Sequence, residues 1–92
     1  MVTAISLINV TRGAIQQCAQ DLLQIDGITE VYSVAGQWDL VAVLRVKDNE
    51  RLEEIVTSQM LQLATITKSE TLIAFRAISK HDLERMFSIG MD

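Results

Sequence analysis

Hydrophobic positions recur with the period of a strand in some stretches of the chain and with that of a helix in others. Residues 2–10 predict a strand, and the break at residues 11–13 opens a helix that ends at the turn of residues 26–27. The apolar stripe of this helix is formed by Ile15, Cys18 or Ala19, Leu22 and Leu23. Residues 28–35 and 38–46 then predict two strands joined by a bend at Gly36.

The remainder of the chain predicts one more helix, one more strand and a short tail. The break at residues 47–49 leads into a second amphipathic helix, with Asp48 as its N-cap. The inner side of this helix carries Leu52, Ile55, Val56 and Gln59 or Met60. A fourth strand is predicted over residues 68–78. Ser79 and Asp82 form a capping-box pattern that predicts a terminal helix over residues 80–88.

The predicted order is therefore β-α-β-β-α-β, and the two halves resemble each other. Residues 23–29 and 61–67 share Leu, Gln, Ile and Thr in register, at an offset of 38 residues. Each half is a βαβ unit, whose crossover is right-handed in nearly all proteins, so both helices are expected on one side of the sheet. The sequence predicts a single α+β domain over residues 1–92, a ferredoxin-like sandwich with a four-stranded antiparallel sheet.

Both faces of the predicted sheet are rich in apolar residues, although its two main helices cover only one. Trp38, Leu40, Ala42, Leu44 and Val46 would point to one side of their strand, and Val41 and Val43 to the other. Four strands about 23 Å long at a spacing of about 4.8 Å give a face of about 450 Å². Two such faces bury about 900 Å², or about 20 kcal/mol gross, against an association cost of about 4–15 kcal/mol. We expect a homodimer paired through the helix-free faces.

Composition narrows the class of protein. The formal net charge is −4 and no stripe of Lys or Arg is present, which argues against direct binding of nucleic acid. The single cysteine, Cys18, has no partner for an internal disulfide and no neighbours that suggest a metal site. The first ten residues lack the basic start of a signal peptide, and no apolar run is long enough to span a membrane. A cytoplasmic protein without metal or cofactor is the expectation.

Candidates for catalysis are few. His81 is the one histidine and lies between two charged residues, which favours a solvated surface position. Cys18 lies on an apolar helix stripe, which favours a buried and inert thiol. Asp39 is a carboxylate within an apolar run, beside Gly36. It either caps the hairpin turn, or accepts from a ligand ammonium while the turn's backbone N–H groups hold a ligand carboxylate.

The segments YSVAGQWDLVAVLRVKD and SETLIAFRA resemble the effector domain of the Lrp/AsnC family of feast/famine regulators, the RAM or ligand-binding domain. The resemblance covers the whole chain, and its most specific part is the G-x-x-D turn of Gly36 and Asp39. Residues 25–28 resemble the family's L-P-G-V with Asp26 in place of Pro, and Thr65 stands where the second copy often has Gly. The family's helix-turn-helix domain is expected to be missing, because Met1 leads directly into the first strand.

This resemblance implies a non-enzymatic sensor of amino acids. Its relatives pair through their sheets and assemble into tetramers, octamers or other rings, with amino-acid effectors bound between dimers. The matching ligand-binding positions are Tyr32, Val34, Gly36, Gln37, Trp38, Asp39, Thr67, Ser69, Glu70 and Thr71. Asp39 and Glu70 would hold the ammonium, Gly36 would offer backbone donors, and the hydroxyls of the last strand would come from a neighbouring subunit. Tyr32 and Trp38 could equally pack an interface, and Thr71 suits a strand on structural grounds.

Two other functions remain open. Dimeric ferredoxin-like domains also include cofactor-free monooxygenases and haem-degrading proteins, for which His81 and Asn9 are the available residues. Alternatively, the chain co-assembles with full-length regulators of the same family and changes how many DNA-binding arms a ring carries.

Overall fold

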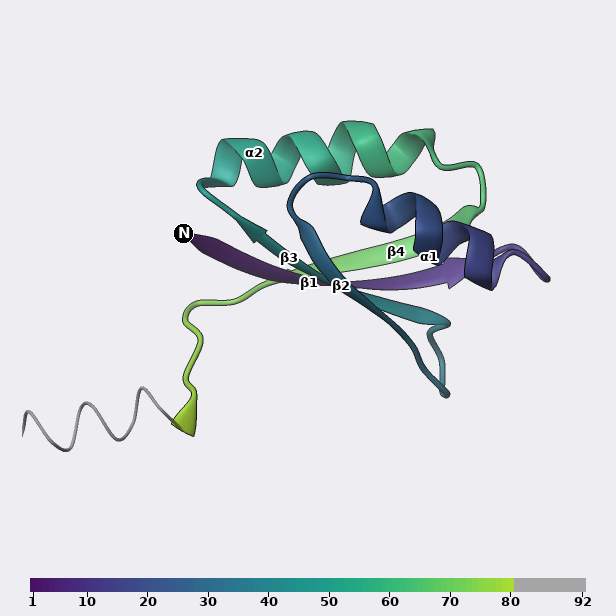
Figure 1. Cartoon of the computed structure of the whole chain (residues 1–92), viewed down its shortest axis with the longest axis horizontal. Helices are drawn as coiled ribbons and strands as arrows, with labels where there is room; N and C mark the ends of the chain where they lie inside the picture. The colour runs from purple at the N-terminus through teal and green to yellow at the C-terminus, as the bar shows by residue number, and fades with distance from the viewer. Residues whose placement is uncertain (81–92) are drawn as a thin grey trace, which may run out of the picture.

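A computed structural model describes residues 1–80 of the chain as one antiparallel sheet with helices on one face (Figure 1). The strands lie in the order β2-β3-β1-β4. The chain continues from α2 to β4 through a π-helical turn, η1, and a 3₁₀ turn, η2. This arrangement confirms the predicted α+β, ferredoxin-like fold. In chain order the elements are β1 (Val2–Val10), α1 (Ile15–Leu23), β2 (Ile28–Ser33), β3 (Leu40–Val46), α2 (Asn49–Glu54), η1 (Ile55–Gln59), η2 (Met60–Gln62) and β4 (Ile66–Ile73).

The core lies between the sheet and the helices, as the period-two pattern of the central strands predicts. The helix-facing residues of β1 and β3 and the inner sides of the two helices are almost entirely inaccessible to solvent. These buried residues confirm the predicted row from Leu40 to Val46 and the buried position of Cys18. The most deeply buried are Ala4, Ser6, Ile8, Cys18, Leu22, Leu40, Ala42, Leu44 and Ile55.

The second helix begins as predicted and then widens. Asp48 accepts a hydrogen bond of 2.8 Å from the backbone N–H of Arg51, which confirms it as the N-cap. From Ile55 onward the helix is a π turn, which adds a residue per turn relative to an α-helix. The added residue turns Met60 into the core, where it is 3% exposed, and leaves Gln59 at intermediate burial.

Strand boundaries differ from the prediction in three places. The strands predicted over residues 28–35 and 38–46 are shorter, because a loop of residues 34–39 separates β2 from β3 and is closed by a 3.0 Å bond from Val34 N to Asp39 O. Trp38 therefore lies outside the buried row of β3. The strand predicted over residues 68–78 begins earlier, at Ile66, and ends at Ile73, because its one neighbour, β1, begins at Val2. Residues 81–88 of the predicted terminal helix, and His81, lie outside the described residues.

The helix-free face is less uniformly apolar than the sequence predicted. Residues that pair across the sheet share a face, so Ile5 lies between Val43 and Leu72, and Leu7 lies between Val41 and Glu70. Glu30 lies opposite Val43 and Tyr32 opposite Val41. The central strands thus present an apolar patch with carboxylates at both edges of the sheet. We call this the sheet-face patch; it consists of Ile5, Leu7, Val41, Val43 and Leu72.

Candidate functional site

The hairpin loop of residues 34–39 and the beginning of β4 lie at the same end of the sheet. Ile8 of β1 pairs with Leu40 on one side and with Ser69 on the other, which brings the two segments to either side of one strand end. Thr67 lies within a register shift, because Asn9 pairs with Lys68 while Val10 pairs with Ile66. The structure therefore gathers Gly36, Gln37, Trp38, Asp39, Thr67 and Ser69 at one end, the hairpin end. The resemblance implied instead that the hydroxyls of the last strand come from a neighbouring subunit.

Asp39 ties the hairpin loop to β1. Its backbone N–H donates to Ile8 O at 3.0 Å and to the Asn9 side-chain Oδ1 at 3.1 Å. Its carboxylate Oδ2 accepts from the backbone N–H of Val10 at 2.9 Å. Asp39 thus has the structural, capping role that the sequence offered as one alternative. Within residues 1–80 no hydrogen bond engages the second carboxylate oxygen, Oδ1, so that atom can accept from a ligand.

Gly36 forms the exposed tip of the loop. Its φ is +130°, a backbone conformation that residues with a side chain rarely adopt, and a Cβ built there would meet nothing within 4 Å. Val34 and Gln37 are also exposed. The tip therefore presents its backbone to the outside, where a second subunit or a ligand can approach it.

Trp38 interacts with a residue that the sequence analysis missed. The Lys68 ammonium lies 5.4 Å from the centroid of the Trp38 ring, within the range of a cation–π interaction. Lys68 pairs with Asn9 and so belongs to the same strand ends as the loop. In the sequence, the only sign of this interaction was a basic residue, Lys68, between two predicted site residues. Its place beside Trp38 could not be predicted without the register of β4.

Tyr32 and Glu70 lie in one row with Val41 and Leu7, one residue in from the row of Leu40, Ile8 and Ser69 at the hairpin end. They lie on the two edge strands, β2 and β4, separated by three strand spacings, or about 14 Å. The Tyr32 hydroxyl donates to the Glu30 carboxylate Oε2. This hydrogen bond and the negative charge of Glu30 raise the pKa of the Tyr32 phenol, and Arg45 opposes them.

Thr71 and Asn9 are both engaged in structural contacts. The Thr71 Oγ1 shares a 2.6 Å hydrogen bond with Ser6 Oγ, a buried side chain on the helix-facing side of β1. Asn9 uses its side-chain oxygen to hold the Asp39 N–H. Thr71 therefore points away from the helix-free face, and the Asn9 oxygen already has a partner.

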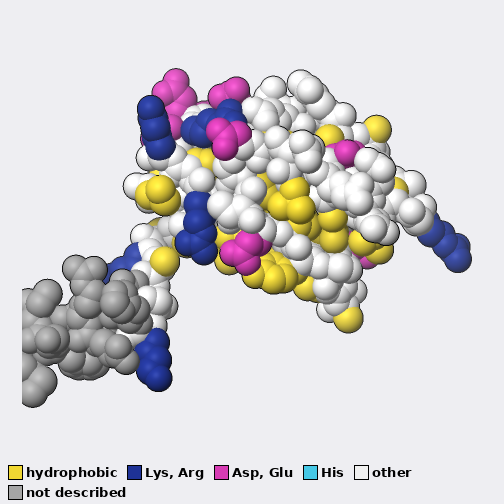
Figure 2. All heavy atoms as spheres, viewed as in Figure 1, with side chains coloured by type: hydrophobic (Ala, Val, Ile, Leu, Met, Phe, Trp, Pro, Cys, Tyr) yellow, Lys and Arg dark blue, Asp and Glu magenta, His cyan; other side chains and the backbone are white. Residues whose placement is uncertain are grey.

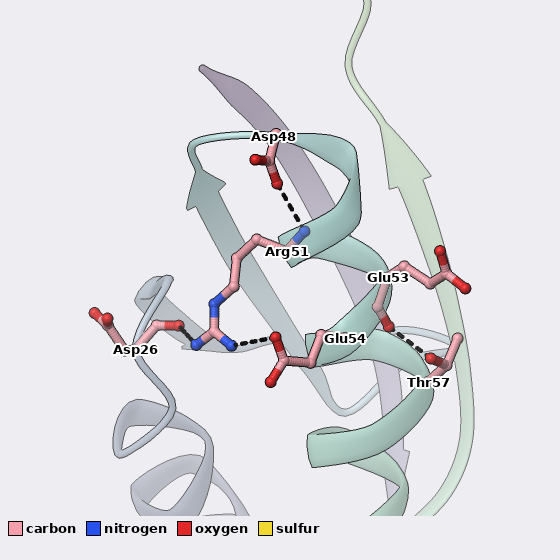
Figure 3. Close-up of polar contacts among 6 residues, drawn as sticks. All are labelled: Asp26, Asp48, Arg51, Glu53, Glu54 and Thr57. Carbon is pink, nitrogen blue, oxygen red and sulfur yellow. Dashed lines mark hydrogen bonds and ion pairs between the residues drawn. The ribbon is translucent and has the colours of Figure 1, made fainter.

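A polar cavity of about 460 Å³ lies at the opposite end of the sheet, near the start of α2. Figure 2 shows charged side chains gathered there, and Figure 3 shows how Arg51 holds the region together. The Arg51 guanidinium donates to Asp26 O at 2.8 Å and forms an ion pair with Glu54 at 3.1 Å. These bonds link the α1–β2 turn to α2. None of the predicted ligand-binding residues lines this cavity.

The hairpin end offers a carboxylate oxygen, an ammonium, an aromatic ring and an exposed backbone turn within a few residues of one another. Such groups suit a small zwitterion, whose ammonium needs an acceptor and whose carboxylate needs donors. Among residues 1–80, no group of three His, Cys, Asp or Glu side chains is placed to hold a metal ion. The helices in this part of the chain are too short or too polar to cross a membrane.

Comparison of the sequence and structure with known proteins identifies a matching family. The family model described as "Lrp/AsnC ligand binding domain" matches residues 3–83. The crystal structure of TTHA0845 from Thermus thermophilus superimposes with a TM-score of 0.81 at 40% sequence identity, and the likeness covers 87% of this chain and 100% of that one. The hypothetical protein PHS023 from Pyrococcus horikoshii superimposes with a TM-score of 0.78 at 26% identity, covering 88% of this chain and 95% of that one.

A longer relative is the uncharacterized HTH-type transcriptional regulator PYRAB16920 of Pyrococcus abyssi. It is 26% identical over 65 residues, which are 71% of this chain and 43% of the regulator. The matching region is thus less than half of that regulator's length.

Proposed function

The chain belongs to the Lrp/AsnC ligand-binding domain family, and from this we propose that it is an oligomeric sensor that binds a small amino acid and modulates transcription regulation without contacting DNA itself. The family is one of regulatory ligand-binding domains. A net charge of −4 without a basic stripe supports the absence of direct DNA contact.

The observation that carries the proposal is the construction of the hairpin end. The loop of residues 34–39 is fixed by Asp39 to β1, so its tip and the free carboxylate oxygen have a defined position. Trp38 and Lys68 add a ring and a cation beside it. A preorganised set of polar groups of this kind lowers the entropic cost of binding a small zwitterion.

The remaining predicted ligand-binding residues enter the site through assembly. Val34 and Gln37 border the loop tip, whereas Tyr32 and Glu70 lie on the two edge strands one residue in from the hairpin end. Thr71 points to the helix side of the sheet. In this proposal a second subunit brings its own Glu70 and β4 hydroxyls to the loop. Subunits pair through the sheet-face patch, where Ile5 and Leu72 are 37% and 46% exposed, and through the adjoining Tyr32, which is 50% exposed. Such pairs then associate into tetramers, octamers or other rings.

The first experiment uses Trp38, the one tryptophan of the chain, as a fluorescent reporter of the hairpin end. Each common amino acid is titrated into the purified protein, and every response is repeated by calorimetry. We expect a saturable change in emission, with heat, for at least one of them. If none gives either signal, the amino-acid sensor is wrong.

The matched test variant is Asp39→Asn. The amide retains an oxygen that can accept from Val10 N–H, but the negative charge that would hold the ligand ammonium is lost. Removing a charged hydrogen-bond partner costs about 1.5–3 kcal/mol, so the dissociation constant should rise about 10- to 100-fold. Unchanged affinity in a folded Asp39→Asn protein would assign Asp39 a structural role only.

A second candidate function is co-assembly with full-length regulators of the family. The relatives named as HTH-type regulators match this chain over 65 residues, which is the region where such regulators would pair with it. Co-purification of tagged protein from cells, followed by mass spectrometry, tests this function. Recovery of a homo-oligomer without a regulator would exclude it under those conditions.

A further inference from the structure

A second groove, largely apolar, lies on the helix side of the sheet between α2 and the edge strand β4. We call it the α2–β4 groove. Its lining includes the apolar residues Leu52, Val56 and Ile73 and the polar residues Glu53 and Thr57. Figure 3 shows Glu53 of α2 and Thr57 of η1 on the side that faces β4. The groove has a volume of about 310 Å³, sufficient to receive a small number of side chains.

The groove exists because the helices do not cover β4. The helix α1 packs on β2 and β3, and α2 packs mainly on β3. Ile73 faces the helix side, since it pairs with the fully buried Ala4, yet it remains 59% exposed. An apolar side chain that points to the core side but is open to solvent indicates a missing neighbour.

The chain leaves the sheet beside this groove. Ala74 N donates to Thr3 O at 2.9 Å and continues the ladder one residue beyond β4. After this bond the chain departs on the side of the sheet opposite to the helices (Figure 1). Phe75 and Ile78 are 108% and 63% exposed. This direction leads the segment away from the groove of its own chain and leaves two large apolar side chains uncovered.

We propose that the C-terminal arm of one copy, residues 75–88, docks in the α2–β4 groove of a second copy. The arm and the groove are chemically complementary. The complementarity is apolar, because the arm carries charges of both signs, namely Arg76, Lys80, Asp82, Glu84 and Arg85, while the charged residue that lines the groove is Glu53. Beyond Lys80 the sequence adds further apolar residues at helical spacing, namely Leu83, Met86 and Phe87.

The reach of the arm fits a pair of subunits. The inference rests on the sheet-to-sheet pairing in the proposed function, in which the arm leaves toward the partner. Two facing sheets lie about 10 Å apart, and a helix layer lies about 10 Å beyond its own sheet, so the partner's groove is about 20 Å away. The six residues 75–80, when extended, span about 20–22 Å. The residues after Lys80 therefore arrive at the partner's groove.

The arm also extends past the family's common domain. The family model ends at residue 83, so residues 84–92 lie beyond it. The docking of this arm would thus be a property of this chain in addition to the pairing of the sheets.

The experiment places one cysteine in the groove and one in the arm, in separate proteins. Thr57→Cys supplies the groove thiol at an exposed position, and Ser88→Cys supplies the arm thiol. The two proteins are mixed, oxidised gently and separated on a non-reducing gel. Gln16→Cys, exposed on α1, replaces Thr57→Cys as the matched control. Cys18 is buried and remains in all the proteins.

We expect a disulfide-linked pair from Thr57→Cys mixed with Ser88→Cys, formed at least tenfold faster than from Gln16→Cys mixed with Ser88→Cys. Equal rates would overturn the inference. A chain carrying both Thr57→Cys and Ser88→Cys supplies a second readout. If this chain forms an internal disulfide at a rate that does not change on dilution, the groove receives the chain's own arm, and this result would also overturn the inference.

Light scattering on the same samples separates the two levels of the proposal. A monomer at micromolar concentration would remove the sheet-to-sheet pairing on which the arm depends. A dimer without selective cross-linking would retain the pairing and reject the arm. A shortened chain that lacks residues 81–92 and carries no introduced cysteine tests the contribution of the arm to the dimer. It should remain dimeric but dissociate at about tenfold higher protein concentration than the full chain.

Discussion

The carboxylate of Asp39 accepts a 2.9 Å hydrogen bond from the backbone N–H of Val10. Val10 lies where the pairing of β1 with β4 shifts register, so its N–H benefits from a side-chain partner. Asp39 supplies that partner from the hairpin loop. One residue therefore both completes the hydrogen bonding of β1 and sets the position of the proposed ligand site.

Substitution of Asp39 should separate stability from ligand binding. Asp39→Ala leaves the part-buried Val10 N–H without its acceptor and should lower the free energy of unfolding by about 1–3 kcal/mol. Asp39→Asn retains an oxygen acceptor and should lose less than half as much. Urea denaturation of the three proteins measures the difference. Equal losses in the two variants would mean that charge, and not the hydrogen bond to Val10, stabilises the loop.

Gly27 should be less replaceable than Gly36. Both have positive φ values, +114° and +130°, but a Cβ at Gly27 would lie 2.7 Å from Ile55 Cδ1 and 2.9 Å from Val46 Cγ1. A Cβ at Gly36 would meet nothing within 4 Å. Gly36→Ala should cost about 1–3 kcal/mol from backbone strain alone, and Gly27→Ala should cost more, because overpacking adds to the strain.

A double-mutant cycle tests the steric part of that cost. Ile55→Val removes the Cδ1 atom that the new Cβ would meet, and on its own should cost about 0.5–1.5 kcal/mol. Combined with Gly27→Ala, the loss should be smaller than the sum of the two single losses by about 0.5 kcal/mol or more. Strict additivity in thermal or urea unfolding would mean that backbone strain dominates at Gly27.

Hydrophobic periodicity was sufficient to predict the sheet and the core. The side chains from Leu40 to Val46 alternate between buried and more accessible positions. The strands β2 and β4 begin at Ile28 and Ile66, which the repeat aligns at its offset of 38 residues, although the fourth strand was predicted to begin at residue 68. The internal copies nevertheless use different turns. Gly27 has a positive φ, whereas Thr65 does not and instead buries a hydroxyl that has no partner among the described residues. Such turn geometry depends on contacts distant in sequence.

The candidate site was predicted less completely, for a related physical reason. The type of residue at Gly36 and Asp39 marked the loop, but the partners of Asp39 are Asn9 and Val10, some thirty positions earlier. The cation beside Trp38 likewise depends on strand register. Tyr32 and Glu70 were grouped with the loop by resemblance, and the register places them one residue in from the hairpin end, on opposite edges of the sheet.

The sheet-face patch should control association. Leu72→Lys places a charge beside Ile5 on the helix-free face, where it would have to be desolvated on pairing. We expect the dimer to dissociate at a protein concentration at least tenfold higher, as measured by light scattering across a dilution series. Leu61→Lys, at a position that is 76% exposed outside the sheet, is the matched control and should leave association unchanged. Equal behaviour of both variants would place the interface elsewhere.

The last prediction concerns the phenol of Tyr32, the one tyrosine of the chain, whose ionisation can be followed by ultraviolet absorbance. The hydrogen bond to Glu30 and the charge of Glu30 raise the pKa of Tyr32 above its ordinary value of 10.0, and Arg45 lowers it. Glu30→Gln should therefore shift the titration midpoint down, whereas Arg45→Gln should shift it up. Since the pKa is raised in the folded state, its stabilising contribution is present below pH 10 and is lost as the pH rises through the folded-state midpoint. Tyr32→Phe should remove that part of the alkaline loss of stability.

If the sheet faces pair, burial of Tyr32 at higher protein concentration should raise the midpoint of the Tyr32 titration further. A midpoint independent of concentration across the range in which light scattering detects dimers would mean that Tyr32 lies outside the interface.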